Sequence, residues 1–175
     1  IMSIGRSFTE AFQKGLRMVF SSDLGIYKYS FNDLSIEELW LRSTIARPTR
    51  MFAVFELLQR NIEPIEIANR TKISAWFIFE LKKISDLSKV VQNDSKFKES
   101  LINNTLDSNH KELLLSLKKN GFSDEQIAYL INDNYEDTIL SKIIRKTRID
   151  NNIKPVIKRI DTSSGEFTTN TNYLY

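Results

Sequence analysis

The sequence has no cysteine and only one histidine among its 175 residues. Without thiols it can form neither a disulfide framework nor a zinc site built on cysteine. The single histidine, His110, sits among polar residues with no second histidine or carboxylate at ligand spacing. We therefore expect His110 to be a solvated surface residue, and we expect no metal site.

Glycine and proline are also scarce, with 5 and 3 residues respectively. So few glycines cannot supply a phosphate-binding loop or a dinucleotide-binding fingerprint. The acidic pairs Glu37–Glu38 and Asp124–Glu125 fall in expected first helical turns, where the helix dipole stabilises carboxylates. We accordingly predict no catalytic, cofactor-binding or metal-binding residue in this segment.

Long apolar runs are missing as well. The longest aromatic-rich stretch, Trp76 to Leu81, is interrupted by Glu80 and is far shorter than the roughly 20 residues that span a bilayer. The amino-terminal residues lack the pattern of a signal peptide, and a start at Ile1 favours a piece of a longer chain. The 25 basic and 22 acidic residues give a nearly balanced surface. We expect a cytoplasmic protein with neither a membrane nor nucleic acid as a partner.

What is present is the pattern of an all-α fold. Hydrophobic residues make up 41% of the chain, which is enough for a packed core. Capping-box spacings at Ser7, Ser35 and Ser123 predict three helix starts, and Pro64 and Ser74 predict two more. The helix that begins at Ser7 carries an apolar residue every four positions; these are Phe8, Phe12, Leu16 and Phe20.

Between and after these helices the sequence changes character. Residues 92–108 are rich in Asn, Asp and Ser and predict a looser joint between two helical groups. Asn120–Gly121 is typical of a left-handed helix end. Apolar spacing then predicts a last helix on Tyr135, Ile139, Leu140, Ile143 and Ile144. Beyond Pro155 we expect a short extended C-terminal segment.

One internal similarity indicates a duplication. Residues 58–61 with the later Glu66-Ile67-Ala68 echo residues 117–120 with the later Glu125-Gln126-Ile127-Ala128, provided that one gap is allowed. Each copy places a helix, a tight turn and a short helix in the same order. We therefore expect two small related helical subdomains, at about 35–90 and 107–147.

The aromatic side chains supply the candidate core or interface residues: Trp76, Phe77, Phe79 and Phe122. The first three are too close in sequence to share one face of a helix, so some must meet a second surface. Burial between two layers of the domain is the favoured interpretation, and Phe77 is expected on the core face with Ile78, Leu81 and Ile84.

A DNA-binding alternative stays open because residues 62–79 have the spacing of a helix-turn-helix. Its second helix would have to present polar and basic groups to base edges. Residues 75–79 are instead overwhelmingly apolar, so we treat DNA binding as the weaker interpretation.

Five segments resemble the large subunit of carbamoyl phosphate synthetase, and their order and spacing agree along essentially the whole chain. They are residues 2–8 (MSIGRSF), 47–52 (RPTRMF), 73–77 (ISAWF), 117–124 (LKKNGFSD) and 153–162 (IKPVIKRIDT). The resemblance implies an internal segment of that subunit. By this resemblance residues 1–20 are the last helix of the first, carboxyphosphate-forming unit, and residues 21–150 are the helical connection or oligomerisation domain. Residues 151–175 are the linker into the second unit, which forms carbamoyl phosphate.

The resemblance also implies what the parent enzyme does. It is a ligase of arginine and pyrimidine biosynthesis with two ATP-grasp units, which use ATP, Mg and K, and a glutamine amidotransferase small subunit supplies its ammonia. The catalytic carboxylates of that family lie outside this segment, so no catalytic residue carries over. The segment is then expected to be a rigid spacer between two active sites, in contact with both flanking units, and a site of self-association.

Overall fold

The computed structural model describes every residue except 133–137, 162, 164, 169 and 175. The described residues form α-helices and one 3₁₀ helix but no strand, which confirms the all-α prediction. The elements are α1 (Phe8–Phe20), η1 (Gly25–Tyr27), α2 (Ile36–Thr44), α3 (Arg50–Gln59), α4 (Pro64–Thr71), α5 (Ala75–Asn93), α6 (Ser95–Ile102), α7 (Ser108–Lys119), α8 (Asp124–Asn132) and α9 (Thr138–Asp150).

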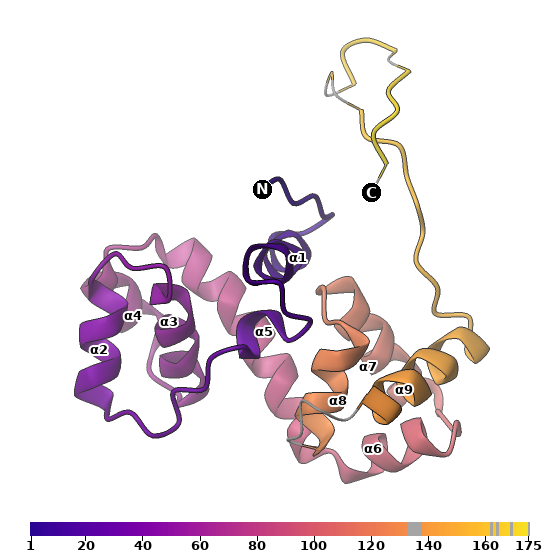
Figure 1. Cartoon of the computed structure of the whole chain (residues 1–175), viewed down its shortest axis with the longest axis horizontal. Coiled ribbons are helices and arrows are strands. Elements are labelled where there is room, and N and C mark those ends of the chain that lie inside the picture. The colour runs from indigo at the N-terminus through magenta and orange to yellow at the C-terminus, as the bar shows by residue number, and fades with distance from the viewer. Residues whose placement is uncertain (133–137, 162, 164, 169, 175) are drawn as a thin grey trace.

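The helices gather in two lobes joined by α5, the longest helix with 19 residues (Figure 1). The first lobe holds α2, α3 and α4, and the second lobe holds α6, α7, α8 and α9. α5 packs against α3 and α4 on one side and against α6 and α8 on the other. α1 packs against α5 and lies between the two lobes.

The core of each lobe combines aliphatic side chains with phenylalanine: Phe52 and Phe55 are buried in the first lobe, and Phe97 and Phe122 are buried in the second. Burying each such side chain contributes about 1.5–3 kcal/mol. The fully buried residues, each at most 1% exposed, include Leu39, Leu57 and Ile67, then Ile78, Leu81 and Ile84 of α5, and then Phe97, Leu101, Leu114, Leu117, Phe122, Ile127 and Ile144.

Most predicted helix starts are present with their caps. Ser35 and Glu38 form a full capping box at α2, and Ser123 and Gln126 exchange the same pair of bonds at α8. Pro64 occupies the first turn of α4. Ser74 lies at the N-cap of α5, as predicted, although its side chain makes no capping hydrogen bond.

The prediction of a loose joint at residues 92–108 is wrong. α5 continues to Asn93, and α6 follows within the same stretch and buries Phe97 and Leu101 completely. Asp94 caps α6 by accepting a hydrogen bond from the Phe97 backbone N–H. The apolar pair at i and i+4 therefore outweighs the polar composition that surrounds it. Tyr135, predicted for the last helix, lies outside the described residues.

The duplication appears in the structure as α3–α4 and α7–α8, with a register that needs no gap. Matched residues are 60 positions apart, as with Leu57 and Leu117 or Ile67 and Ile127, and all four are fully buried. Asn61 and Gly121 match as well, and both are left-handed, with φ of 61° and 87°. The register predicted from the sequence paired residue 58 with 117 because it matched the two identical residues Asn61 and Asn120. In the structure the backbone position of Asn61 corresponds to that of Gly121.

The C-terminal segment leaves α9 and extends away from the helices, as predicted (Figure 1). The Ile160 N–H donates to the Tyr173 carbonyl, and Arg159 and Leu174 form an isolated antiparallel bridge. None of the described helices is both long and apolar enough to cross a membrane.

Candidate functional site

The most elaborate set of interactions surrounds α1. Its apolar stripe faces α5 and the first lobe: the Phe8 ring lies 5.4 Å from Trp76 and 5.3 Å from Phe77, and the Phe20 ring lies 5.1 Å from Phe52. These aromatic contacts fix the rotation of α1 about its own axis, because the opposite side of the helix carries polar groups that must face elsewhere.

The polar side of α1 docks on the turn between α7 and α8. Thr9 Oγ1 donates to Asn120 Oδ1 at 2.9 Å, Gln13 Nε2 donates to the Asn120 carbonyl at 2.9 Å, and Arg17 Nη1 donates to the Gly121 carbonyl at 2.7 Å. Thr9 and Gln13 are at most 1% exposed. A helix more than 100 residues earlier in the chain thus satisfies the carbonyls at the end of α7.

Gln126 completes this seam from the first turn of α8. Its Nε2 donates to Gln13 Oε1 at 2.8 Å and to the Leu24 carbonyl at 2.9 Å, while its Oε1 accepts from Arg17 Nη1 at 3.0 Å and from the Ser123 N–H at 2.8 Å. The side chain is fully buried, and all four hydrogen bonds open to its amide are made. A buried network in which every hydrogen bond is made stabilises a single arrangement of its side chains.

Arg17 is the charged member of the seam. Burial lowers the pKa of Arg17, while the carboxylates of Asp23 and Glu125 oppose that shift. An arginine stays protonated in any such setting, so its hydrogen bonds to the turn are charge-assisted and strong.

Gly121 permits the close approach of α1. A Cβ at this position would lie 2.9 Å from the Glu10 Cα and 3.1 Å from the Glu10 carbonyl oxygen, both of them backbone atoms. The residue also has a φ of +87°, which strains residues with a side chain. Both conditions select glycine, so the sequence Asn120-Gly121 serves the α1 contact as well as the helix end.

A buried charge cluster lies on the other side of the same turn. Arg148 Nε donates to Asp124 at 3.0 Å (Oδ1) and 2.9 Å (Oδ2), and Lys118 Nζ donates to Asp124 Oδ1 at 2.9 Å. Burial lowers the pKa of Lys118, and the Asp124 carboxylate opposes the shift. Arg148 also donates to the carbonyl of Ile153 at 3.2 Å, so the cluster fixes the point where the chain leaves α9.

Residues 117–126, which we call the junction turn, therefore hold both chain ends of the helical body. α1 binds to one side through Asn120, Gly121 and Gln126, and residue 153 is tied to the other side through Asp124 and Arg148. From the sequence we assigned helix caps and a candidate core residue, Phe122, to this stretch, but no contact with α1. Its one available signal was the glutamine in the capping box, where glutamate would have capped equally well.

The four aromatic residues predicted as core or interface differ in burial. Phe122, within the junction turn, is buried at 1% exposure, whereas Trp76, Phe77 and Phe79 are 54%, 42% and 45% exposed. Burial of these three inside the domain, and Phe77 on the core face, are wrong. Ile78, Leu81 and Ile84 fill the buried side of α5, and the neighbouring positions turn outward.

His110 is not a solvated surface residue either. Its side chain is 16% exposed, with Nε2 3.6 Å from Asp94 and Nδ1 3.5 Å from Asp107, and its ring lies 5.7 Å from Phe97. These two aspartates cap α6 and α7. The position of Asp107 three residues before His110 was a signal for one of the contacts, but Asp94 comes close only through the fold.

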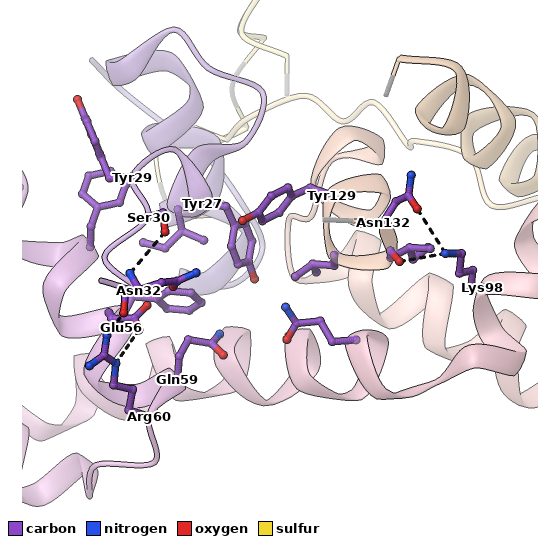
Figure 2. A pocket seen from close by; sticks show the side chains of 16 residues that line it. Tyr27, Tyr29, Ser30, Asn32, Glu56, Gln59, Arg60, Lys98, Tyr129 and Asn132 are labelled. Carbon is purple, nitrogen blue, oxygen red and sulfur yellow. Dashed lines mark hydrogen bonds and ion pairs between the residues drawn. The ribbon is translucent and has the colours of Figure 1, made fainter. Parts of the chain in front are cut away.

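A hollow of about 590 Å³ lies between the two lobes (Figure 2). Arg60 is paired with Glu56 at 2.8 Å, and Lys98 lies 3.4 Å from Asn132 Oδ1. Burial raises the pKa of Tyr27, so its phenol stays protonated. Within the described part of the chain, no cluster of His, Cys, Asp or Glu could hold a metal ion.

Comparison with known proteins assigns the chain. The family model for the oligomerisation domain of the carbamoyl-phosphate synthetase large chain matches residues 1–152. The arginine-specific large chain of carbamoyl phosphate synthase from Neurospora crassa, a mitochondrial protein, is 35% identical over 100% of this chain and 13% of its own length. A chloroplastic relative from Arabidopsis thaliana is 31% identical over 99% of this chain and 14% of its own. Multifunctional protein CAD of Squalus acanthias is 36% identical over 100% of this chain and 7% of its own.

The comparisons decide between the two functions left open by the sequence. α4 and α5 do form a helix-turn-helix, but α5 begins with exposed aromatic residues, and no comparison supports DNA binding. The organelles named for the relatives leave the cytoplasmic location a prediction. The chain spans about an eighth of the Neurospora large chain and matches one domain of it. It belongs to the carbamoyl phosphate synthetase large-chain family, as the oligomerisation domain.

Proposed function

We propose that this domain is a rigid, non-catalytic connector that fixes the relative placement of two synthetase units in a longer chain. The observation that carries the proposal is the junction turn, to which α1 is bound directly and residue 153 is bound through Arg148. In this proposal residues 1–20 end the first unit, residues 21–150 form the connector and residues 151–175 lead into the second unit.

Rigidity follows from the way α1 is held. A shift of α1 too small to admit water would leave Thr9, Gln13 and Gln126 buried without their hydrogen-bond partners. Each unsatisfied buried polar group costs about 1–3 kcal/mol. A hinge at this point would therefore be strongly disfavoured, and a displacement of the first unit would be transmitted to α8 and α9.

We further propose that the parent is a glutamine-dependent carbamoyl phosphate synthase whose ATP-, Mg- and K-dependent chemistry takes place outside this segment. Two features support this: the relatives are carbamoyl phosphate synthases, and the charged groups traced in the domain are committed to structural pairs. Its partners would be the flanking units of the same chain and a glutamine amidotransferase small subunit. A fixed separation of active sites would let an unstable intermediate pass between them without escaping to water.

The test is the coupling of glutamine hydrolysis to product formation in the full-length enzyme. Gln126→Leu removes four hydrogen bonds from the seam and should raise the ratio of glutamine hydrolysed to carbamoyl phosphate formed, with each partial reaction less affected. Gln92→Leu, an exposed glutamine of α5, is the matched control. An unchanged ratio in a Gln126→Leu enzyme whose α1 amides exchange faster with deuterium would contradict the connector proposal.

Self-association is a second candidate function, favoured by the matched family description, which is that of an oligomerisation domain. Exposed apolar side chains such as Leu41 on α2, at 59%, are available for it. A stable interface needs about 800 Å² from each partner. Light scattering of the full-length enzyme over a concentration series should show a mass that rises with concentration; a constant monomer mass would refute self-association.

A further inference from the structure

The hollow between the two lobes, which we call the interlobe hollow, has the size of a small-molecule site. Its volume of about 590 Å³ lies within the range of about 300–1,000 Å³ that is typical of such sites. Gln59 and Arg60 at the end of α3 line it from the first lobe, and Lys98 of α6 and Tyr129 of α8 line it from the second (Figure 2). A molecule that fills the hollow therefore touches both lobes.

Tyr27 gives the hollow a fixed shape. Its ring lies 5.5 Å from the Phe55 ring of the first lobe and 5.7 Å from the Tyr129 ring of the second. Its hydroxyl is hydrogen-bonded to that of Ser88 on α5. Because these contacts anchor Tyr27 to three helices, the hollow keeps its shape without a ligand, and little conformational entropy is lost on binding.

The polar groups of the first-lobe wall differ in whether they have partners. The Arg60 guanidinium is engaged, because it donates to Glu56 at 2.8 Å and to the Leu34 carbonyl at 2.8 Å. The Gln59 amide makes no hydrogen bond within the described part of the chain, and it points into the hollow (Figure 2). This amide can both donate to a ligand and accept from it.

Lys98 supplies the positive charge that is available to a ligand. Its Nζ reaches the Ile131 carbonyl and Asn132 Oδ1 only at 3.4 Å, beyond the usual range of about 2.7–3.2 Å for such hydrogen bonds. Glu56 is compensated by Arg60, so the lysine gives the described lining a net positive charge that favours an anion. A lysine binds phosphate as a point charge, whereas the fork of an arginine matches a carboxylate better.

The remaining polar groups of the lining indicate the body of the ligand. Amides and hydroxyls face the hollow beside the tyrosine rings, from Ser30 and Asn32 as well as from Gln59. An apolar ligand would take water from these groups without replacing its hydrogen bonds, which is unfavourable. A sugar ring offers hydroxyls to the amides and a C–H face to an aromatic ring, so it suits both kinds of neighbour.

We propose that the interlobe hollow binds a phosphorylated sugar, with the phosphate at Lys98 and the sugar hydroxyls at Gln59 and its polar neighbours. A free sugar phosphate and a nucleotide both present this group. Bound in this way, the ligand links α3 to α6 and holds the two lobes together across the hollow.

Hydrogen–deuterium exchange of the full-length enzyme, read by mass spectrometry, tests the proposal. The probe is ribose 5-phosphate, raised in steps. Where its concentration is about ten times the dissociation constant, exchange in the peptides that contain Gln59, Lys98 and Tyr129 should slow about tenfold by mass action. Inorganic phosphate at the same concentration should protect these peptides much less, because it lacks the hydroxyls. Equal protection by inorganic phosphate, or no protection by ribose 5-phosphate, would overturn the proposal.

Substitutions on the two walls locate the site. Lys98→Met should abolish the protection by ribose 5-phosphate, and Lys98→Arg, which keeps the charge, should retain most of it. Lys96→Met is the matched control, because Lys96 is an exposed residue of the same helix outside the hollow. Gln59→Leu should weaken the binding of ribose 5-phosphate about tenfold, the effect of one good hydrogen bond. Protection that persists in Lys98→Met, or that Lys96→Met loses equally, would contradict the assignment.

Adenosine 5′-monophosphate distinguishes the two sources of the phosphorylated sugar. Protection that is stronger with this nucleotide than with ribose 5-phosphate assigns a nucleotide, and equal protection assigns a free sugar phosphate. Only protection that depends on Lys98 counts, because in the proposed function the parent chain has nucleotide sites elsewhere. The connector function is tested separately at Gln126, so either proposal can fail alone.

Discussion

At the level of single residues, Asp124 is a buried carboxylate of the second lobe whose charge is compensated by two cations. It is 7% exposed and accepts hydrogen bonds from both Lys118 and Arg148. Removing one partner of a buried pair costs about 3–5 kcal/mol, because the other charge stays buried without compensation. We expect Arg148→Met to lower the free energy of unfolding by about 3 kcal/mol, since Lys118 still pairs with Asp124. Urea unfolding measures this, and Arg145→Met, an exposed position on α9, should change it by less than about 0.5 kcal/mol.

Substitutions of Phe122 and Phe77 should lower the free energy of unfolding, measured in urea, by different amounts because only Phe122 is buried. Phe122→Ala leaves a cavity in the core and should cost about 4 kcal/mol. Phe77→Ala should cost only about 1 kcal/mol, because its half-exposed ring loses mainly the contacts with Phe8 and Trp76. Similar losses of unfolding free energy in the two variants would contradict the difference in burial between Phe122 and Phe77.

Glu10 should make stability depend on pH. Partial burial raises its pKa, but hydrogen bonds from Lys14 and from the Arg6 N–H outweigh this and hold the pKa below the ordinary value of 4.5. A carboxylate with a lowered pKa stabilises the fold above its unfolded pKa, and this contribution is lost as the pH falls through the folded pKa. Glu10→Gln should therefore be less stable than the parent at pH 7, with a difference that disappears in acid. A difference that grows below pH 4 would contradict this assignment.

At the scale of elements, the contact between α1 and the junction turn depends on Gly121. Gly121→Asn keeps a residue that tolerates left-handed φ but adds a Cβ against the Glu10 backbone. We expect a loss of about 2 kcal/mol, together with faster hydrogen exchange in α1. The matched control is Asn61→Gly at the equivalent position of the first copy, which should cost at most a few tenths of a kcal/mol in this left-handed setting. Equal effects would show that φ, and not the approach of α1, selects glycine.

Helix starts were predicted well because capping is local. Ser35 and Ser123 carry their whole signal within four residues, and the structure has both boxes. α6 was missed because Phe97 and Leu101 are its only strong apolar signal in a polar stretch, and the energy that holds them comes from α9 and the other packed helices. Periodicity assigns an apolar face to α5, but it could not say that Phe77 falls just outside it.

At the scale of the whole molecule, α5 belongs to both lobes and should make them unfold together. Leu81 is fully buried near the middle of this helix. Leu81→Ala should cost about 3 kcal/mol and speed hydrogen exchange equally at Leu57 in the first lobe and Leu117 in the second. Leu39→Ala in α2 is the comparison, with its effect measured at the same two amides. A Leu81→Ala variant that changes exchange in one lobe only would mean that the lobes are independent.

The all-helical class, the positions of most helix starts, the duplication and the family resemblance could be read from the sequence. All of these depend on residues within a few turns of one another or on order along the chain. Three other features follow from the folded arrangement alone: Gln126, Arg17 and Asn120 meet, His110 lies between two aspartates, and the aromatic residues at the start of α5 face water. These facts depend on side chains from distant segments competing for the same partners. The same physical reason explains the glutamine at 126: as a cap it is interchangeable with glutamate, but against Gln13 and a backbone carbonyl it must also donate.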